Sequence, residues 1–391
     1  MNFIKALLSA LLAIAPLTTS IVHAAYEWHY IPNLDYYAIA SDNSTAVAVG
    51  GIASAIQDSD GNWSTLMHNS LTFDNIIYNG DHFISLKNDT AWISKDGKRW
   101  KVGFKVKDEA LISVFSDGKD YYYYTKKNLY RSNDYGRTYS RWRVNNDGYM
   151  CTEILRFNNT FVCRTNNNDP TTYLGPMTGS LLISSDGINW SEANRAFSVY
   201  DIALADDMII AIGKYTLNSD TVPALFISVD GKNWVTETID DSTPYRYQNR
   251  LSYYFVTVAY GNGTVVALPY NATRVFVRSD NQWKTKKLRT PLRPIALTWN
   301  GREFVSVGLG GEIATSKDGL NWIYTYKLPR TIWQSWHFNN SYYAFANDFL
   351  PHSQTNIGGL YKSPHGEVWK RSRQKITLYA TGSPTKTLEM S

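Results

Sequence analysis

The sequence predicts an all-β chain folded as a single β-propeller of four-stranded antiparallel blades, and three observations support this. Aromatic residues make up 14% of the 391 residues, whereas charged residues make up only 19%. Many of the aromatic residues are Tyr and Trp, which favour the pleated, half-buried surface of a sheet. A short turn sequence recurs along the chain, and an alternating apolar pattern around a tight turn precedes each copy.

The N-terminal segment has the features of a secretory signal peptide. Lys5 precedes an apolar run over residues 6–16, and small residues follow at Ala24-Ala25. The run is too short to cross a bilayer, and no other stretch approaches about 20 uninterrupted apolar residues. We therefore expect cleavage after residues 1–24, a single mature domain over residues 25–391, a periplasmic or secreted location, and no transmembrane segment.

The recurring turn marks one structural repeat. Four copies share Ser, Asp, Gly and Trp at identical offsets and begin at Ser94, Ser184, Ser228 and Ser316. Four looser copies begin at Ser59, Ser132, Ser279 and Ser363. Their spacing is close to the roughly 40 to 50 residues of a four-stranded propeller blade. Repeats from about residue 37 to 374 therefore predict eight blades, with seven as the alternative if the shortened first copy is not a blade.

A second pattern lies upstream of each turn. Alternating apolar residues flank Asn-Gly or a similar pair, as at Asn79-Gly80 and Asn300-Gly301. Such pairs accept the positive φ of a two-residue hairpin. Each repeat is therefore expected to run strand, tight turn, strand, variable loop, strand, Ser-x-Asp-Gly turn and strand.

The residues of the Ser-x-Asp-Gly turn have architectural roles. Ser and Asp side chains accept hydrogen bonds from nearby backbone N–H groups, and Gly takes a left-handed conformation that a Cβ would penalise. The Trp that follows is expected to bury a large apolar face between neighbouring sheets. These roles are assigned to Ser94, Asp96, Gly97, Trp100, Ser132, Asp134, Gly136, Ser184, Asp186, Gly187, Trp190, Ser228, Asp230, Gly231, Trp234, Ser316, Asp318, Gly319 and Trp322.

These turns resemble the Asp boxes, or BNR repeats, of sialidase-like propellers and of secreted propellers such as the photosystem II assembly factor-like family. Residues 132–139 carry the family's Ser, Asp, Gly, Thr and terminal aromatic at the family's spacing, and the other copies are shorter. The resemblance covers nearly the whole mature chain and implies the propeller fold. It does not imply a function, because the repeat occurs in enzymes and in non-enzymes.

The resemblance also suggests an enzymatic alternative, a sialidase-like glycoside hydrolase or lyase. Sialidases hold the substrate carboxylate with arginines, the first of which lies in a Phe/Tyr-Arg-Ile-Pro motif. The nearest match is His29-Tyr30-Ile31-Pro32, where Tyr30 stands in the arginine position. Because Tyr cannot replace a bidentate guanidinium, the sequence favours a non-enzymatic protein and assigns no catalytic residue.

The remaining composition gives no sign of a cofactor or a metal site. The seven histidines, of which His23 belongs to the signal, show no His-Glu-x-x-His spacing. The net charge of +5 is spread without a Lys/Arg run, which favours a solvated surface over a nucleic-acid interface. We therefore expect a monomer that needs no cofactor or metal and binds no nucleic acid.

The order of strands predicts which face of the propeller binds a ligand. Turns between strands one and two and between strands three and four emerge on one face, where every turn is tight. The loops between strands two and three and the blade links emerge on the other face and vary in length, and such loops on a rigid scaffold collect binding residues. We expect a protein or glycan ligand there, held by residue types common in interfaces: Tyr245, Arg246, Tyr247, Arg250, Tyr173, Trp333, Trp336 and His352.

The two cysteines lie on opposite arms of a predicted hairpin around Asn158-Asn159. Export would place Cys151 and Cys163 in an oxidising compartment, which permits a disulfide. Their register is offset by about three residues, however, and such a pair bridges only if the backbone bends. The sequence leaves both the disulfide and two free thiols open.

Overall fold

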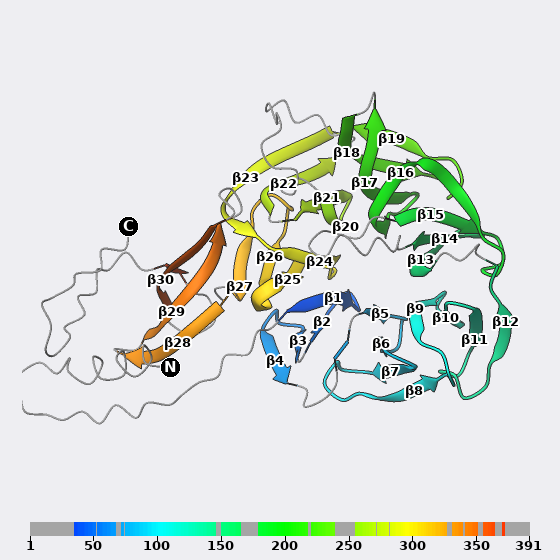
Figure 1. The fold of residues 1–391 in the computed structure, drawn as a ribbon, viewed down its shortest axis with the longest axis horizontal. Helices are drawn as coiled ribbons and strands as arrows, with labels where there is room; N and C mark the ends of the chain where they lie inside the picture. The colour runs from blue at the N-terminus through cyan, green and yellow to red at the C-terminus, as the bar shows by residue number, and fades with distance from the viewer. Residues whose placement is uncertain are drawn as a thin grey trace, which may run out of the picture. The chain divides into compact units, whose positions relative to one another are not determined.

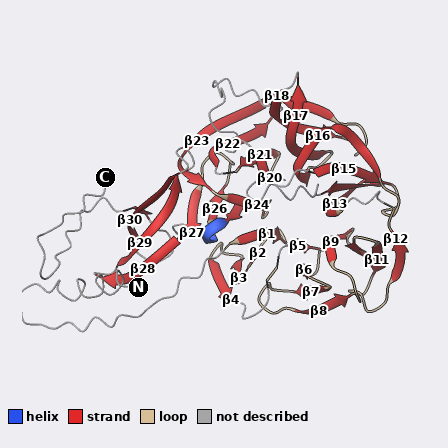
Figure 2. Cartoon of the chain, viewed as in Figure 1, coloured by secondary structure: helices blue, strands red, loops and turns tan. Residues whose placement is uncertain are grey.

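A computed structural model describes residues 35–51, 53–67, 72–73, 75–145, 150–165, 179–217, 220–238, 255–270, 272–280, 282–326, 331–338, 341–350, 355–363 and 370–371. Strands dominate these residues, and the one helix among them is a single 3₁₀ turn at Leu309–Gly311 (Figure 2). None of the described helical segments is long and apolar enough to cross a membrane.

The chain divides into two compact units. One unit is Asn33–Lys327, and the other combines Met1–Pro32 with Leu328–Ser391. The described part of the second unit is one antiparallel sheet in chain order, formed by β28 (Thr331–Phe338), β29 (Ser341–Leu350), β30 (Thr355–Ser363) and β31 (Lys370–Arg371). A single domain over residues 25–391 stays a prediction.

Within Asn33–Lys327 the strands pair antiparallel with their neighbours in the chain. The first three sheets contain β1 (Tyr36–Ser41), β2 (Ala46–Gly50), β3 (Ala53–Gln57) and β4 (Trp63–Met67); β5 (Ile76–Tyr78), β6 (Phe83–Lys87), β7 (Thr90–Ser94) and β8 (Lys101–Lys105); and β9 (Leu111–Ser116), β10 (Tyr121–Thr125), β11 (Asn128–Ser132) and β12 (Ser140–Arg143). The last two contain β20 (Phe255–Gly261), β21 (Thr264–Pro269), β22 (Ala272–Ser279) and β23 (Gln282–Leu292); and β24 (Pro294–Trp299), β25 (Phe304–Gly308), β26 (Ile313–Ser316) and β27 (Ile323–Tyr326).

A seven-stranded sheet lies between these in the chain and consists of two repeats that share a strand. Its strands are β13 (Cys151–Phe157), β14 (Thr160–Thr165), β15 (Gly179–Ser184), β16 (Ser191–Leu204), β17 (Ile209–Leu217), β18 (Asp220–Ser228) and β19 (Val235–Thr238). At the start of β16, Ser191 pairs with β15, and at its end Leu204 pairs with β17. The long strand β16 is therefore the fourth strand of one repeat and the first strand of the next.

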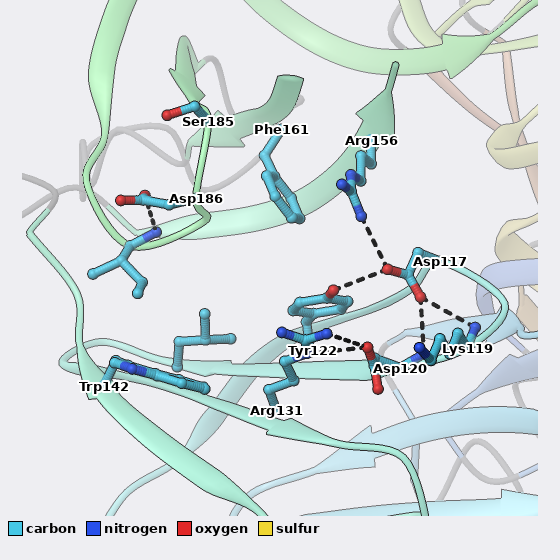
Figure 3. Close-up of a pocket in the computed structure, with 12 residues that line it drawn as sticks. Asp117, Lys119, Asp120, Tyr122, Arg131, Trp142, Arg156, Phe161, Ser185 and Asp186 are labelled. Atoms are coloured by element: carbon cyan, nitrogen blue, oxygen red, sulfur yellow. Dashed lines mark hydrogen bonds and ion pairs between the residues drawn. The ribbon is translucent and has the colours of Figure 1, made fainter. Parts of the chain in front are cut away.

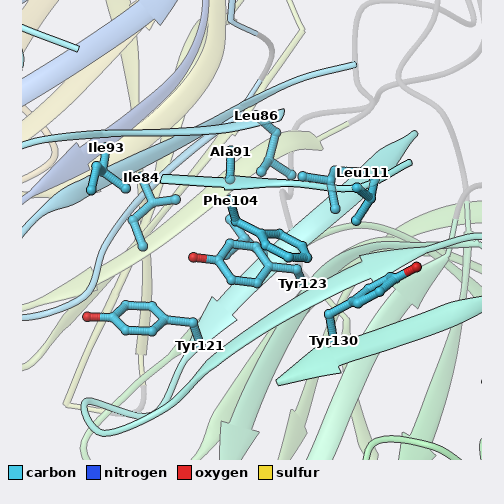
Figure 4. Close-up of a cluster of buried hydrophobic side chains, with 11 residues drawn as sticks. Ile84, Leu86, Ala91, Ile93, Phe104, Leu111, Tyr121, Tyr123 and Tyr130 are labelled. Carbon is cyan, nitrogen blue, oxygen red and sulfur yellow. The ribbon is translucent and has the colours of Figure 1, made fainter. Parts of the chain in front are cut away.

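Buried apolar side chains join each repeat to its neighbour. Figure 4 shows the cluster between β5–β8 and β9–β12, in which the rings of Phe104 and Tyr123 stack with centroids 4.5 Å apart. In another cluster, Val305 and Ile313 of the repeat β24–β27 pack with Tyr36 and Ala48 of the repeat β1–β4. Such burial is the main favourable term in folding.

The contacts between repeats close a circuit within Asn33–Lys327. Each repeat contacts the next one along the chain, through its first strand except at β5–β8, where β6 contacts β9, and β24 and β25 contact β1 (Figure 1). The circuit runs through seven four-stranded groups of described residues, whereas the eighth sheet, β28–β31, belongs to the other unit. Radial repetition of four-stranded antiparallel sheets defines a β-propeller, so the fold class that the sequence predicts is confirmed.

Most first strands carry a β-bulge near their start. The register shifts in β1, β13, β16, β20 and β24. A glycine often ends the second strand opposite the bulge, because a Cβ there would meet the bulged backbone. A Cβ on Gly50 would lie 1.8 Å from the carbonyl oxygen of Asp35, and one on Gly308 would lie 1.8 Å from that of Arg293.

One of these bulges allows a disulfide across the hairpin β13–β14. Cys163 pairs with Ile154, three residues after Cys151. The register shift between Cys151 and Glu153 brings the two cysteine Cα atoms to 5.5 Å, within the range that a disulfide spans. Of the two alternatives that the sequence leaves open, the structure has the disulfide, and both cysteines are buried.

Candidate functional site

The Ser-x-Asp-Gly turns are closed by their own side chains. In one of them Ser184 Oγ donates to Asp186 Oδ1 at 2.9 Å, and this oxygen accepts two backbone N–H groups of residues 188 and 189 at 2.8 Å. Trp190 Nε1 donates back to the carbonyl oxygen of Gly187 at 3.1 Å. The same side-chain bonds occur in the turns that begin at Ser94, Ser228 and Ser316.

The turn at Ser132 closes differently, as its longer sequence requires. Asp134 Oδ1 accepts the backbone N–H of Thr138 at 2.9 Å, and Asp134 Oδ2 accepts the Thr138 hydroxyl at 2.7 Å. The backbone N–H of Thr138, followed by its hydroxyl, lowers the pKa of Asp134 to about 2. The turn acids are thus bonded within their own turns, so their carboxylates do not by themselves mark a site.

A groove of about 390 Å³ opens between the sheet β9–β12 and the strands β13–β16 (Figure 3). Its walls include the tight turn between β9 and β10 and the Ser-x-Asp-Gly turn after β15, so it lies on the face with the tight turns. Its volume falls within the range of small-molecule pockets. The lining residues are Asp117, Lys119, Asp120, Tyr122, Leu129, Arg131, Trp142, Arg156, Phe161, Ser185, Asp186 and Ile188.

Asp117 is the most heavily bonded residue at one end of the groove. Its carboxylate accepts the Tyr122 hydroxyl at 2.9 Å, Arg156 Nη1 at 3.0 Å, and the backbone N–H groups of Asp120 and Lys119. Burial alone would raise the pKa of Asp117, but these donors lower it below its ordinary value. Burial, and next the hydrogen bond to Asp117, raise the pKa of Tyr122 to about 12.

A second ion pair lies beside the first. Arg131 Nε donates to Asp120 Oδ2 at 3.0 Å, Nη2 donates to the same oxygen, and this bonding raises the pKa of Arg131. The Asp120 side chain is only 8% exposed. The guanidinium of Arg131 lies 5.6 Å from the centroid of the Tyr122 ring, and that of Arg156 lies 5.0 Å from Phe161, so both cations rest on aromatic faces.

Trp142 forms the other end of the groove. It lies on β12, the outermost strand of its sheet, and is 37% exposed. Figure 3 shows its indole away from Asp117, with Tyr122 and Arg131 between them. The groove therefore runs from a half-exposed aromatic ring to two fixed ion pairs.

One of these ion pairs has a counterpart elsewhere and belongs to the fold. Arg156, two residues before the tight turn of its repeat, reaches Asp117 in the turn of the preceding repeat. Tyr260, also two residues before its turn, donates to Asp206 in the turn of the preceding repeat at 2.7 Å. Such a bond ties neighbouring repeats together, so it does not by itself mark a site.

Arg131 and Trp142, in contrast, differ from the residues at the same positions in most other repeats. The residue before the turn serine is Arg131 here and Arg278 in the repeat of Ser279, but Ile93, Ile183 and Ile227 in three other repeats. The third residue after the turn aromatic is Trp142 here, but Gly103, Ala193 and Glu237 in the same repeats. The fold therefore does not demand an arginine or a tryptophan at these positions, and residues that break a local rule of the fold often serve a function.

The described residues that line the groove include none of the binding residues that the sequence predicts. Trp333 and Trp336 lie within the strand β28, whereas the sequence predicts them in a connecting segment, and their side chains are outside the described part. The others lie outside the described residues altogether: Tyr173, Tyr245, Arg246, Tyr247, Arg250 and His352. Loop length predicts a binding site on the opposite face. The sequence feature that could have predicted the groove is the presence of Arg131 and Trp142 at positions where most other repeats have different residues.

A pair of carboxylates lies on two neighbouring first strands. Glu153 of β13 forms an ion pair with Arg164 Nε at 3.0 Å. Asp201 of β16 accepts the backbone N–H of Val258 at 2.8 Å. Burial, and after it the charge of Glu153, raise the pKa of Asp201. Among the residues that the structure describes, no cluster of His, Cys, Asp and Glu could hold a metal ion.

No protein-family model matches the sequence, and no curated protein matches it. Similar solved structures include PorZ, an essential bacterial surface component of the type-IX secretion system of Porphyromonas gingivalis, with a TM-score of 0.51 and 9% identity over 88% of this chain and 46% of PorZ. This chain thus spans about half the length of PorZ.

Two further structures match at similar levels. A streptogramin B lyase has a TM-score of 0.52 and 13% identity over 74% of this chain and 93% of the lyase. The computationally designed Ika8 protein has a TM-score of 0.50 and 10% identity over 82% of this chain and 95% of the design. At these identities the likeness concerns the fold alone.

Proposed function

We propose that this protein is an exported, non-enzymatic scaffold that binds a protein or glycan ligand, and that the ligand lies in the groove between β9–β12 and β13–β16. The observation that carries the proposal is that Arg131 and Trp142, which the repeat does not require, both line this groove. Tryptophan and arginine are also the residue types that contribute most binding energy in interfaces.

The groove is arranged for binding before any ligand arrives. Arg131 is held by Asp120 and rests on Tyr122, and Arg156 is held by Asp117. A ligand therefore need not order these side chains, which lowers the entropic cost of association. The Asp-box resemblance, the signal peptide and a monomeric state belong to the same proposal, and PorZ is an example of a similar fold at a bacterial surface.

The variable-loop face is the competing surface for the same function. The sequence predicts it from the loop residues 243–250. The sequence predicts the variable-loop face opposite the tight turns, so substitutions on one surface should leave the other intact. Two multiple variants separate the surfaces. The groove variant combines Trp142→Ala and Arg131→Ala, and the loop variant combines Tyr245→Ala, Arg246→Ala and Tyr247→Ala.

The test is retention of a ligand by the full mature chain, using a glycan array and a pull-down from the native cell envelope. We expect the groove variant to bind the retained ligand at least about 10-fold more weakly, because an interface tryptophan or arginine typically contributes about 1–2 kcal/mol or more. The loop variant should bind like the wild type. Equal thermal midpoints of the three proteins are the control for folding.

Two results would contradict the groove as the site. Unchanged binding by the groove variant would exclude it, and loss of binding in the loop variant alone would assign the ligand to the variable-loop face.

A glycoside hydrolase or lyase is the second candidate, supported by the pair Glu153 and Asp201. A buried carboxyl group with a raised pKa near a second carboxyl group is the arrangement of an acid and its partner in glycoside hydrolysis. This function predicts glycan cleavage that Asp201→Asn abolishes. Intact glycans after incubation with the wild-type protein would exclude it.

A further inference from the structure

We infer that the ligand of the groove is a neutral saccharide, with one sugar ring against the indole of Trp142 and its hydroxyl groups bonded by Arg131, Asp120 and Arg156. This inference rests on the proposed function, because it names the ligand of the same groove. Three properties of the lining carry it: charge balance, unused hydrogen-bonding groups, and the position of the aromatic ring.

The groove carries no excess charge. Its lining contains three carboxylates, Asp117, Asp120 and Asp186, and three cations, Lys119, Arg131 and Arg156. Four of these six groups form the two ion pairs Asp117–Arg156 and Asp120–Arg131. An anionic polymer is recognised by clustered cations that lack such partners, so the lining suits a ligand without charge.

The ion pairs leave hydrogen-bonding capacity of both kinds. Arg131 uses Nε and Nη2 for Asp120, and Arg156 uses Nη1 for Asp117. Among the described residues, Arg131 Nη1 and Arg156 Nη2 therefore have no acceptor, and Asp120 Oδ1 has no side-chain donor. A sugar hydroxyl both donates and accepts, so it matches a surface that offers donors and an acceptor side by side.

Trp142 supplies a surface for the apolar face of a sugar ring. Its indole is half-exposed at the end of the groove, away from the ion pairs around Asp117 (Figure 3). A sugar ring has the same division, with C–H groups on its face and hydroxyls around its rim. Aromatic side chains gain from covering apolar area of this kind.

A peptide ligand fits the groove less well. Peptides that bind along a sheet pair with a free strand edge. The strands β10 and β11, which contribute Tyr122, Leu129 and Arg131, each have a hydrogen-bonded neighbour on both sides. These two strands therefore present side chains and no free backbone edge to the groove, in contrast to β12, which lies at the margin of its sheet.

The test is a titration of the full mature protein with the neutral oligosaccharides that a glycan array retains, in parallel with acidic oligosaccharides and a peptide library. We expect a neutral oligosaccharide to bind, and Trp142→Ala to weaken its binding at least about 10-fold. Trp142→Phe, which keeps a flat ring, should stay within about 3-fold of the wild type.

Salt and a control variant sharpen the test. Because the lining is balanced, raising NaCl from about 50 to about 500 mM should change the dissociation constant less than about 2-fold. The matched control is Val102→Ala, which removes another exposed apolar side chain from the outer strand β8 and should not alter binding.

The outcomes separate the inference from the proposed function. A peptide or an acidic glycan that needs Trp142, or binding that salt weakens strongly, would overturn the inference and keep the groove as the site. Binding of every ligand unchanged by Trp142→Ala would overturn both. Absence of any bound neutral oligosaccharide would also overturn the inference, and the envelope pull-down would then decide the proposed function.

Discussion

At the scale of single residues, the glycine of each Ser-x-Asp-Gly turn meets two demands. Gly136 has φ +90°, and a Cβ on it would lie 2.3 Å from Phe104 Cδ2 in the preceding repeat. Gly319 has φ +71°, and its Cβ would lie 2.4 Å from Val266. The turn glycine must therefore adopt a positive φ and also leave room for the side chain of the preceding repeat. The need for room cannot be deduced from turn chemistry alone.

A matched pair of substitutions separates the two demands. Gly118 has φ +85°, but a Cβ added to it would meet no atom within 4 Å, so Gly118→Ala should cost only the left-handed conformation, about 1–2 kcal/mol. Gly136→Ala adds overpacking against Phe104 and should cost about 3 kcal/mol or more. Urea unfolding measures both variants, and equal losses would contradict the close packing.

The turn carboxylates should give the protein an acid-sensitive stability. Backbone donors outweigh burial and hold the pKa of Asp186 at about 2, below the unfolded value of about 3.9. A lowered pKa stabilises the fold above the unfolded value, and this contribution is lost as the pH falls from about 4 to about 2. Because Asp186 is exposed, its share should be below about 1 kcal/mol.

The variant Asp186→Asn checks the sign of this effect. It should unfold more easily than the wild type at about pH 7, and the gap should narrow by about pH 2.5, since the wild-type carboxylate is then partly protonated. The measurement is the free energy of unfolding in urea at both pH values. A gap that stays constant with pH would show that the carboxylate charge does not contribute.

At the scale of strands and turns, the sequence predicts local structure well and neighbours between repeats poorly. The hairpin predicted around Asn158-Asn159 is β13–β14, because alternation and turn residues are local signals. The groove brings side chains of two sheets together, such as Trp142 and Phe161, and no local pattern encodes that proximity. The groove could be found from the sequence only by comparing the repeats with one another at the positions of Arg131 and Trp142.

The disulfide is the clearest stabilising feature at this scale. It joins cysteines 12 residues apart, for which the entropy of the unfolded chain predicts about 2–3 kcal/mol. The double variant Cys151→Ser with Cys163→Ser should lose that amount in urea unfolding, and a reductant should destabilise the wild type equally. The chain has only these two cysteines, so a reductant that still destabilises the double variant would contradict the assignment.

At the scale of the whole molecule, the contacts within Asn33–Lys327 join the last repeat of that unit, β24–β27, to the first, β1–β4. This unit should therefore close without the sheet β28–β31. The apolar cluster between β24–β27 and β1–β4 buries apolar side chains where the last and first repeats of that unit meet. The sequence shows eight repeats and cannot tell which of them closes on the first, because all carry the same turn.

We therefore expect residues 33–327 alone to fold. Their far-UV circular dichroism should show sheet, and urea should unfold them in one cooperative transition. Residues 33–292, which lack β24–β27, should fail to do so because the closing cluster is lost. An unfolded fragment 33–327 would instead mean that the strands β28–β31 are needed for closure.

The most direct measurement on the binding scaffold is a crystal structure of the mature chain with its retained ligand. We expect ligand density against the indole of Trp142 and within hydrogen-bonding distance of Arg131. Density among residues 243–250, with nothing bound in the groove, would contradict the proposed site.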